Sequence, residues 1–175
     1  MRRFTLAFTG LFFAGLLGAP SSYAKPVEAD VRALASSPQW LTTKVYIEGE
    51  PENDVKAKYP GVVGISMWDP QRNRYEFFYT DTGRSKHPDG GGGYFLVTDD
   101  KQTHILVPDL GPHRTIVRRL EKLDNTEFTY SREVPRDMVA TNPPVRIYVV
   151  HAPYTGGTNK DSDVKLVKHP IYIQP

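Results

Sequence analysis

The chain has 175 residues, of which 22 are basic and 20 acidic, and it contains no cysteine. This length is typical of one domain with its own hydrophobic core, and the lack of cysteine excludes disulfides and thiol-based catalysis. The small net charge argues against proteins that bind nucleic acid or an anionic membrane surface through a strongly basic face.

The N-terminus has the pattern of an export signal. Arg2 and Arg3 precede an apolar run over residues 4–17, and a small residue, Ala24, ends the segment where a signal peptidase would cleave. The alternative is a transmembrane anchor, which needs about 20 apolar residues, and this run is shorter. We therefore expect a signal peptide over residues 1–24.

Cleavage there would start the mature chain near Lys25. Because Arg2 and Arg3 are the charged residues removed, 20 basic and 20 acidic residues would remain. A net charge of zero gives no electrostatic basis for binding nucleic acid. We expect an exported protein, periplasmic or extracellular, with no nucleic-acid partner and no membrane span after the signal is removed.

The first element expected in the mature chain is a short amphipathic helix. Val27, Val31 and Leu34 recur at helical spacing with charged residues between them, and residues 36–38 should end the helix. Eight runs rich in β-branched and aromatic residues then predict strands. They cover residues 40–47, 62–68, 74–80, 93–98, 104–107, 114–123, 127–132 and 145–152.

Short turns separate several of these strands. Residues 69–73, 99–102 and 124–126 carry Asp, Asn or Pro, which favour turns. Short turns join antiparallel neighbours, because a parallel crossover needs a dozen or more residues. Closing such a sheet removes both of its exposed edges. We therefore predict an all-β fold, an eight-stranded antiparallel up-and-down barrel with a short N-terminal helix, and a two-layer sandwich as the alternative.

The barrel domain should cover residues 25–154, followed by a C-terminal tail over residues 155–175. The end of this tail, residues 165–175, is apolar enough to pack on the barrel or to add a strand. The sequence pattern does not choose between these two placements.

Several blocks of residues carry a family resemblance. They are Trp40-Leu41-Thr42-Thr43-Lys44-Val45-Tyr46, Arg74-Tyr75-Glu76-Phe77-Phe78, Phe128-Thr129-Tyr130 and His151-Ala152-Pro153-Tyr154. In this order and spacing they resemble a family of secreted bacterial lipocalin-like domains catalogued as a domain of unknown function, over residues 33–154. The resemblance implies a lipocalin-like, calycin-type barrel and an exported setting, and no established activity. That family usually has an acidic residue before the last-strand histidine, where this chain has Val150.

One face of each strand points into a barrel, and the apolar faces indicate which one. On four of the strands these faces bring aromatic side chains together with two arginines and a histidine. The candidate ligand-binding residues are Tyr75, Phe77, Arg118, Tyr130, Arg132 and His151. Because arginine binds carboxylates in a bidentate way, this set suits a small hydrophobic or amphipathic molecule with an anionic head.

The alternative interpretation of these residues is a filled core. The arginines would then stand at the rim with their heads in water, and His151 would be a hydrogen-bonded histidine at a strand end. The face that carries Tyr75 and Phe77 continues to Tyr79, which we also expect to point inward. A pairing shift of one residue would place all of these side chains outside.

The other motifs fall short of a catalytic, metal or cofactor site. The histidines are scattered, without the spacing of metal ligands. Residues 159–163 alternate oxygen ligands, but Val164 and Pro170 stand where a calcium loop needs glycine and glutamate. The glycine run at residues 90–93 lacks the Lys-Ser or Lys-Thr of a phosphate loop, which favours a flexible loop. Ser66 lacks the second glycine of a nucleophile elbow, so we predict no catalytic residue, no metal and no cofactor.

Three functions follow from different uses of such a barrel. The first, which we favour, is an exported binding protein with a small hydrophobic or amphipathic ligand in its cavity. The second is a calycin-like enzyme acting on a small organic molecule there, with His151, Tyr130 or Tyr75 as the acid–base group. The third is a protein-interaction module that uses the loops at residues 48–61 and 81–92.

Overall fold

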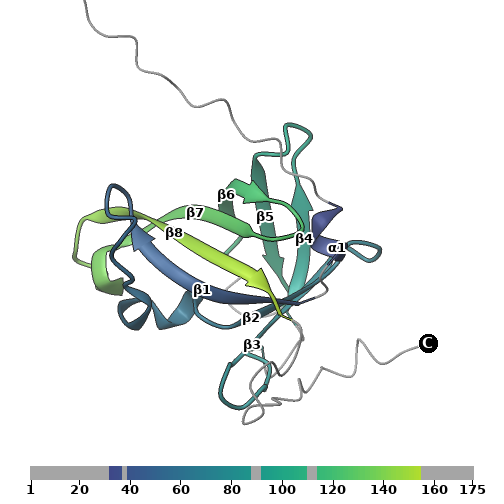
Figure 1. Cartoon of the computed structure of the whole chain (residues 1–175), viewed down its shortest axis with the longest axis horizontal. Helices are drawn as coiled ribbons and strands as arrows, with labels where there is room; N and C mark the ends of the chain where they lie inside the picture. The colour runs from purple at the N-terminus through teal and green to yellow at the C-terminus, as the bar shows by residue number, and fades with distance from the viewer. Residues whose placement is uncertain (1–31, 37–38, 88–91, 110–113, 155–175) are drawn as a thin grey trace, which may run out of the picture.

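Eight antiparallel strands close into a barrel (Figure 1). The computed structural model describes residues 32–36, 39–87, 92–109 and 114–154. Each strand pairs with the next in the chain and the last pairs with the first, so the predicted up-and-down barrel is confirmed and the sandwich alternative is wrong. The strands are β1 (Gln39–Ile47), β2 (Ile65–Asp69), β3 (Arg74–Phe78), β4 (Gly93–Val97), β5 (Thr103–Pro108), β6 (Ile116–Leu123), β7 (Phe128–Pro135) and β8 (Pro144–Pro153).

One helical turn, α1 (Ala33–Ser36), precedes the barrel. Ala33 and Leu34 are buried in the same core cluster as Trp40. The predicted helix began further upstream, but Val27 and Val31 lie outside the described residues, as do the predicted signal peptide and C-terminal tail. No helix in the described ranges is long and apolar enough to cross a membrane.

Aromatic side chains fill much of the barrel interior. The ring of Trp68 lies 5.2 Å from that of Phe95 and 5.8 Å from that of Phe128, measured between centroids. The faces predicted to point inward on β6, β7 and β8 do so, and their buried apolar members belong to one cluster. Tyr79 is a correction: β3 ends at Phe78, and Tyr79 is 49% exposed in the turn that follows, where its N–H donates to the carbonyl of Arg84.

The junction between β3 and β4 depends on two glycines. Among the described residues these strands share two residue pairs, one of which joins Tyr75 to Gly93. A Cβ on Gly93 would collide with the carbonyl oxygen of Val107, and one on Gly92, whose φ is +90°, with that of Tyr75. Only glycine permits this close approach. The flexible-loop interpretation of residues 90–93 is therefore wrong for these two positions, and the rest of the run lies outside the described residues.

Residues 59–64, which we call the cover segment, connect to the start of β2. They follow a 3₁₀ turn, η1 (Lys56–Lys58), and contain a second one, η2 (Pro60–Val62). The second strand was predicted to start at residue 62, which is wrong, because the N–H groups of Val62 and Val63 donate to carbonyls three residues earlier in helical turns. A third turn, η3 (Arg136–Met138), links β7 to β8, and its Asp137 N–H donates to the Tyr59 hydroxyl at 3.1 Å, which anchors the start of the cover segment.

Candidate functional site

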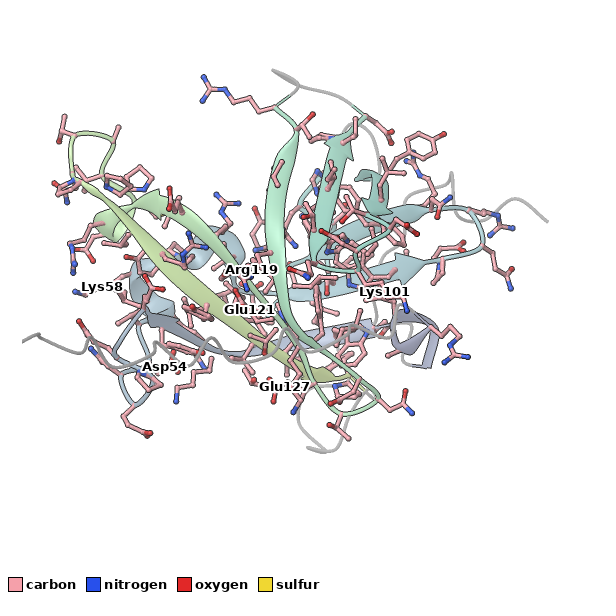
Figure 2. The ribbon with its side chains drawn as sticks, turned by 90° about the horizontal axis from the view of Figure 1, so that it is seen from above. Asp54, Lys58, Lys101, Arg119, Glu121 and Glu127 are labelled. Atoms are coloured by element: carbon pink, nitrogen blue, oxygen red, sulfur yellow. The ribbon has the colours of Figure 1, made fainter. Side chains whose placement is uncertain are left out.

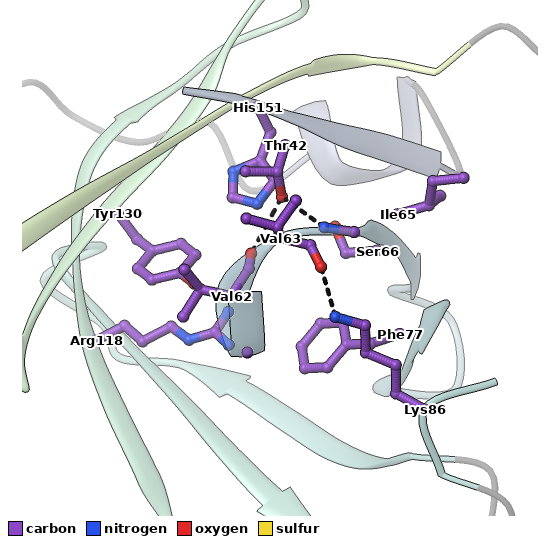
Figure 3. Close-up of a pocket in the computed structure, with 12 residues that line it drawn as sticks. Thr42, Val62, Val63, Ile65, Ser66, Phe77, Lys86, Arg118, Tyr130 and His151 are labelled. Atoms are coloured by element: carbon purple, nitrogen blue, oxygen red, sulfur yellow. Dashed lines mark hydrogen bonds between the residues drawn. The ribbon is translucent and has the colours of Figure 1, made fainter. Parts of the chain in front are cut away.

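A small cavity of about 30 Å³ lies between the cover segment and the interior faces of the barrel (Figure 3). Two cations, Arg118 and Lys86, line it together with His151, and the lining contains no aspartate or glutamate. The cover segment contributes the apolar side chains Val62 and Val63. The cavity lining therefore combines positive charge with apolar side chains.

Arg118 projects inward from β6 and is only 6% exposed. Its guanidinium carbon lies 4.1 Å from the ring centroid of Tyr130 and 5.3 Å from that of Phe77, so aromatic rings cover the cation. No acidic side chain pairs with Arg118 within the described ranges, and its Nε has no hydrogen-bond partner there. Burial, as the largest cause, lowers the pKa of Arg118, and Arg132 acts in the same direction.

Arg119, the next residue in the chain, differs from Arg118 in being exposed and paired with an acidic side chain. Arg119 points outward from β6 and forms an ion pair with Glu121, with 3.6 Å between Nε and Oε1 (Figure 2). Its side chain is 55% exposed, so water screens the charge. The alternation of the strand thus places Arg118 beside the cavity and Arg119, the residue after it, in solvent.

His151 lies near the end of β8, and its ring stacks against those of Phe128 and Tyr130, with 4.9 Å and 5.5 Å between centroids. Its Nδ1 is 2.9 Å from the carbonyl oxygen of Phe128. A carbonyl can only accept, so Nδ1 carries the proton and Nε2 is left as an acceptor. Burial, as the largest cause, lowers the pKa of His151 to about 3, so the imidazole is neutral near neutral pH. His151 is therefore both the hydrogen-bonded histidine of the alternative interpretation and part of the cavity lining.

Hydrogen bonds from two side chains hold the cover segment over the cavity (Figure 3). The Thr42 hydroxyl donates to the Val62 carbonyl at 3.2 Å and accepts from the Gly64 N–H at 3.2 Å. On the other side the Lys86 ammonium donates to the Val63 carbonyl. Burial lowers the pKa of Lys86, and the nearby charge of Asp81 opposes that shift.

A second histidine, His104, lies deeper in the barrel and was not predicted as a site residue. It is fully buried on β5, with its ring 4.7 Å from Trp68 and 5.6 Å from Phe95. Neither of its ring nitrogens has a hydrogen-bond partner in the part of the chain that the structure describes. Burial lowers the pKa of His104 well below its ordinary range, and the charge of Arg118 adds to this effect.

The structure brings four of the six predicted site residues to the cavity. Phe77, Arg118, Tyr130 and His151 line it. Tyr75 packs against Phe77 with 4.9 Å between ring centroids, and Arg132 is half-buried, but neither lines the cavity. The alternative that placed the arginine heads in water at the rim is wrong for Arg118, because that side chain is buried.

The lining residues that sequence reasoning missed differ in how they could have been found. Thr42 lies on the inward face of β1, where strand alternation would have selected it. Ser66 lies on β2, in which four consecutive residues are buried, so alternation alone does not select it. Lys86 belongs to a loop that folds back on β3 through an isolated β-bridge between Phe78 and Ser85. No local sequence pattern predicts that contact.

The cavity can bind an anion better than it can transfer protons. Its cations have no acidic partner in the lining, and His151 offers a neutral acceptor. Across the described ranges no group of three or more metal-ligating side chains lies together. The calcium-like spacing at residues 159–163 lies outside those ranges.

A family model described as "Domain of unknown function (DUF4822)" matches residues 32–161, which include every described strand. No curated protein matches the chain. The family description assigns no activity, so the function has to be argued from the cavity itself.

Proposed function

The chain belongs to the DUF4822 family, and we propose that it is an exported binding protein that holds the anionic head of a small amphipathic molecule in its barrel. Arg118 carries the proposal: it is buried, it faces the cavity, and no acidic side chain in the described ranges pairs with it. A buried charge without a partner costs several kcal/mol. An anion in the cavity would offset that cost by supplying the missing charge.

The size of the cavity limits how much of the ligand it can enclose. About 30 Å³ accommodates a group of a few atoms, since one water needs roughly 10–15 Å³ by this kind of measure. Drug-sized molecules occupy pockets of about 300–1,000 Å³. The head group would therefore sit beside Arg118, while the apolar part contacts Val62, Val63 and Phe77 on its way out.

The wider setting of this proposal is a lipocalin-like protein outside the cytoplasm. The closed eight-strand up-and-down barrel supports the lipocalin-like part, because lipocalins share that architecture. The charged, then apolar, then small-residue pattern over residues 1–24 supports export, to a periplasm or to the outside of a bacterial cell.

The other two uses of the barrel stay predictions. For catalysis, a pKa of about 3 makes His151 a weak proton acceptor at neutral pH, which favours its role as a hydrogen-bonding group. For protein interaction, several large exposed apolar side chains lie on the outer faces of β4 and β6 and not on the loops at residues 48–61 and 81–92. They are Tyr94, Leu96 and Val117.

Calorimetric titration tests the proposal with matched ligands. Sodium hexanoate and 1-hexanol have the same chain, and only the first carries a charge. We expect the wild-type protein to bind hexanoate more tightly than hexanol by about tenfold or more, or ~1.4 kcal/mol. Arg118→Met should remove this difference, because it deletes the charge and keeps much of the side-chain volume.

Arg119→Met is the matched control, since it removes the next arginine in the chain from the outer face. It should leave the preference for hexanoate unchanged. The proposal fails if the wild type binds neither compound, if it binds both equally, or if Arg118→Met keeps the preference.

A further inference from the structure

We infer that His104 is a positioning residue for Arg118: when an anion is bound, a ring nitrogen of His104 accepts the Nε–H of Arg118, and both Nη groups then bind one carboxylate. This inference rests on the proposed function, which supplies the anion. It adds a residue to the site and narrows the anion to one that presents two oxygens to the guanidinium, as a carboxylate does.

The barrel places these two side chains next to each other. His104 on β5 and Arg118 on β6 are direct register partners, and both project into the interior. Side chains on opposed positions of neighbouring antiparallel strands start about 4.5–5.5 Å apart at Cβ. A small rotation of the long arginine side chain therefore suffices to join them.

Both side chains have unused hydrogen-bonding atoms in an apolar setting. The Nε of Arg118 and the two ring nitrogens of His104 are buried and have no partner among the described residues. The rings around His104 belong to Trp68, Phe95 and Phe128, and a leucine would suit such surroundings better. Buried polar groups are bonded in nearly all proteins, so a donor and an acceptor left unused side by side call for an explanation.

A neutral partner suits this position better than an acidic one. A carboxylate at position 104 would hold Arg118 equally well, but it would neutralise the guanidinium and remove its attraction for a ligand. A neutral imidazole offers one acceptor without a charge. His104 can therefore fix the orientation of Arg118 and leave the positive charge for the ligand.

The same geometry indicates the ligand class. Tyr130 and Phe77 cover the guanidinium, which leaves its edges for hydrogen bonds. With Nε–H directed to His104, the remaining edge presents two parallel N–H groups from Nη1 and Nη2. Two oxygens of one carboxylate or one phosphate group match this pair, whereas a halide offers a single acceptor.

Nuclear magnetic resonance on ¹⁵N-labelled wild-type protein tests the contact directly. Saturating sodium hexanoate should shift the unprotonated ring nitrogen of His104 as it becomes an acceptor, and a coupling across the hydrogen bond should link it to Arg118 Nε. Sodium chloride at the same concentration should produce neither change. Unchanged His104 resonances in the hexanoate-bound protein would overturn the inference.

Three substitutions at position 104 separate positioning from simple packing, each measured by hexanoate titration. His104→Leu removes the acceptor and should weaken binding by about tenfold without lowering thermal stability. His104→Gln restores an acceptor and should recover most of the affinity. His104→Asp supplies an internal anion and should abolish binding.

The outcomes also separate this inference from the proposed function. If the wild type fails to bind hexanoate, the proposed function fails. If the wild type binds and Arg118→Met does not, while His104→Leu and His104→Asp both bind like the wild type, then only the role of His104 is wrong. Should His104→Leu fail to fold, the resonance measurement on the wild type still decides.

Discussion

The barrel buries two arginines, and they are surrounded in opposite ways. Arg74 on β3 has an aromatic ring over it, that of Tyr94 at 4.3 Å, and both of its Nη groups pair with the carboxylate of Asp109. Arg118 on β6 also has aromatic rings over it, but no acidic side chain in the described ranges pairs with it. Within the described ranges, one guanidinium has its charge balanced by a carboxylate and the other does not.

This difference separates a structural arginine from a binding one. Arg74 stands where β3 meets β4, so its ion pair fastens a junction that has two residue pairs. Arg118 faces the cavity, where no acidic side chain of the lining balances its charge. Functional sites often keep a charged group without a partner, although this lowers the stability of the fold.

The largest expected effect on the free energy of unfolding comes from replacing Arg74 and Arg118, one at a time, with an uncharged residue. Arg74→Met leaves Asp109 without its partner, so we expect the free energy of unfolding to fall by about 3 kcal/mol. Arg118→Met removes an unbalanced buried charge, so unfolding should become harder by about 1 kcal/mol in the absence of ligand. Urea denaturation at pH 7 measures both, and changes of the same sign would contradict the comparison.

The next largest effect should come from acid, which should lower the free energy of unfolding through His151, a neighbour of Arg118 in the cavity lining. The pKa of His151 is about 3 in the folded protein and 6.5 ordinarily, so between these values the unfolded chain binds more protons. The stability contributed by neutral His151 is complete above pH 6.5 and decreases as the pH falls through this window. Between pH 7 and pH 4.5 the loss should be roughly 2–3 kcal/mol.

Urea denaturation at the two pH values tests this prediction. Burial lowers the pKa of His104 as well, so His104 adds to the acid-induced loss in the same direction. His104→Leu should therefore lose less stability than the wild type when the pH falls to 4.5. Equal losses in the two proteins would mean that His104 is not held neutral by the fold.

A smaller effect is expected at the cover segment. Thr42→Val keeps the shape of the side chain and removes both side-chain hydrogen bonds to the segment, which should cost about 2 kcal/mol of stability. It should also speed hexanoate association, because the segment opens more often. Stopped-flow mixing measures the rate. Thr43→Val is the control, since the Thr43 hydroxyl bonds outside the cavity to the Val150 carbonyl, and similar kinetics in both variants would exclude the segment as a barrier.

The sequence predicted the barrel and the part of the site that follows from strand alternation. Turn residues separated eight runs, and alternation placed Arg118, Tyr130 and His151 on inward faces, where the structure has them. These predictions succeed because a strand has a fixed period of two and a closed barrel has one interior.

The missed residues depend on tertiary contacts or on ambiguous patterns. Lys86 reaches the cavity from a loop that folds back on β3. His104 begins a short run with Ile105, Leu106 and Val107, in which both faces are largely apolar, so alternation could not select an interior face. The cavity volume depends on how the rings of Trp68 and its neighbours fill the interior, which no one-dimensional pattern encodes.

A crystal structure of the wild-type protein grown with sodium butyrate tests the central claim most directly. The claim is that the positive charge of Arg118 has no acidic partner in the described ranges because the carboxylate of a bound ligand pairs with it. We expect both carboxylate oxygens within about 2.7–3.2 Å of the Nη atoms of Arg118, under the cover segment. Butyrate bound only at surface cations, with water alone beside Arg118, would contradict the account.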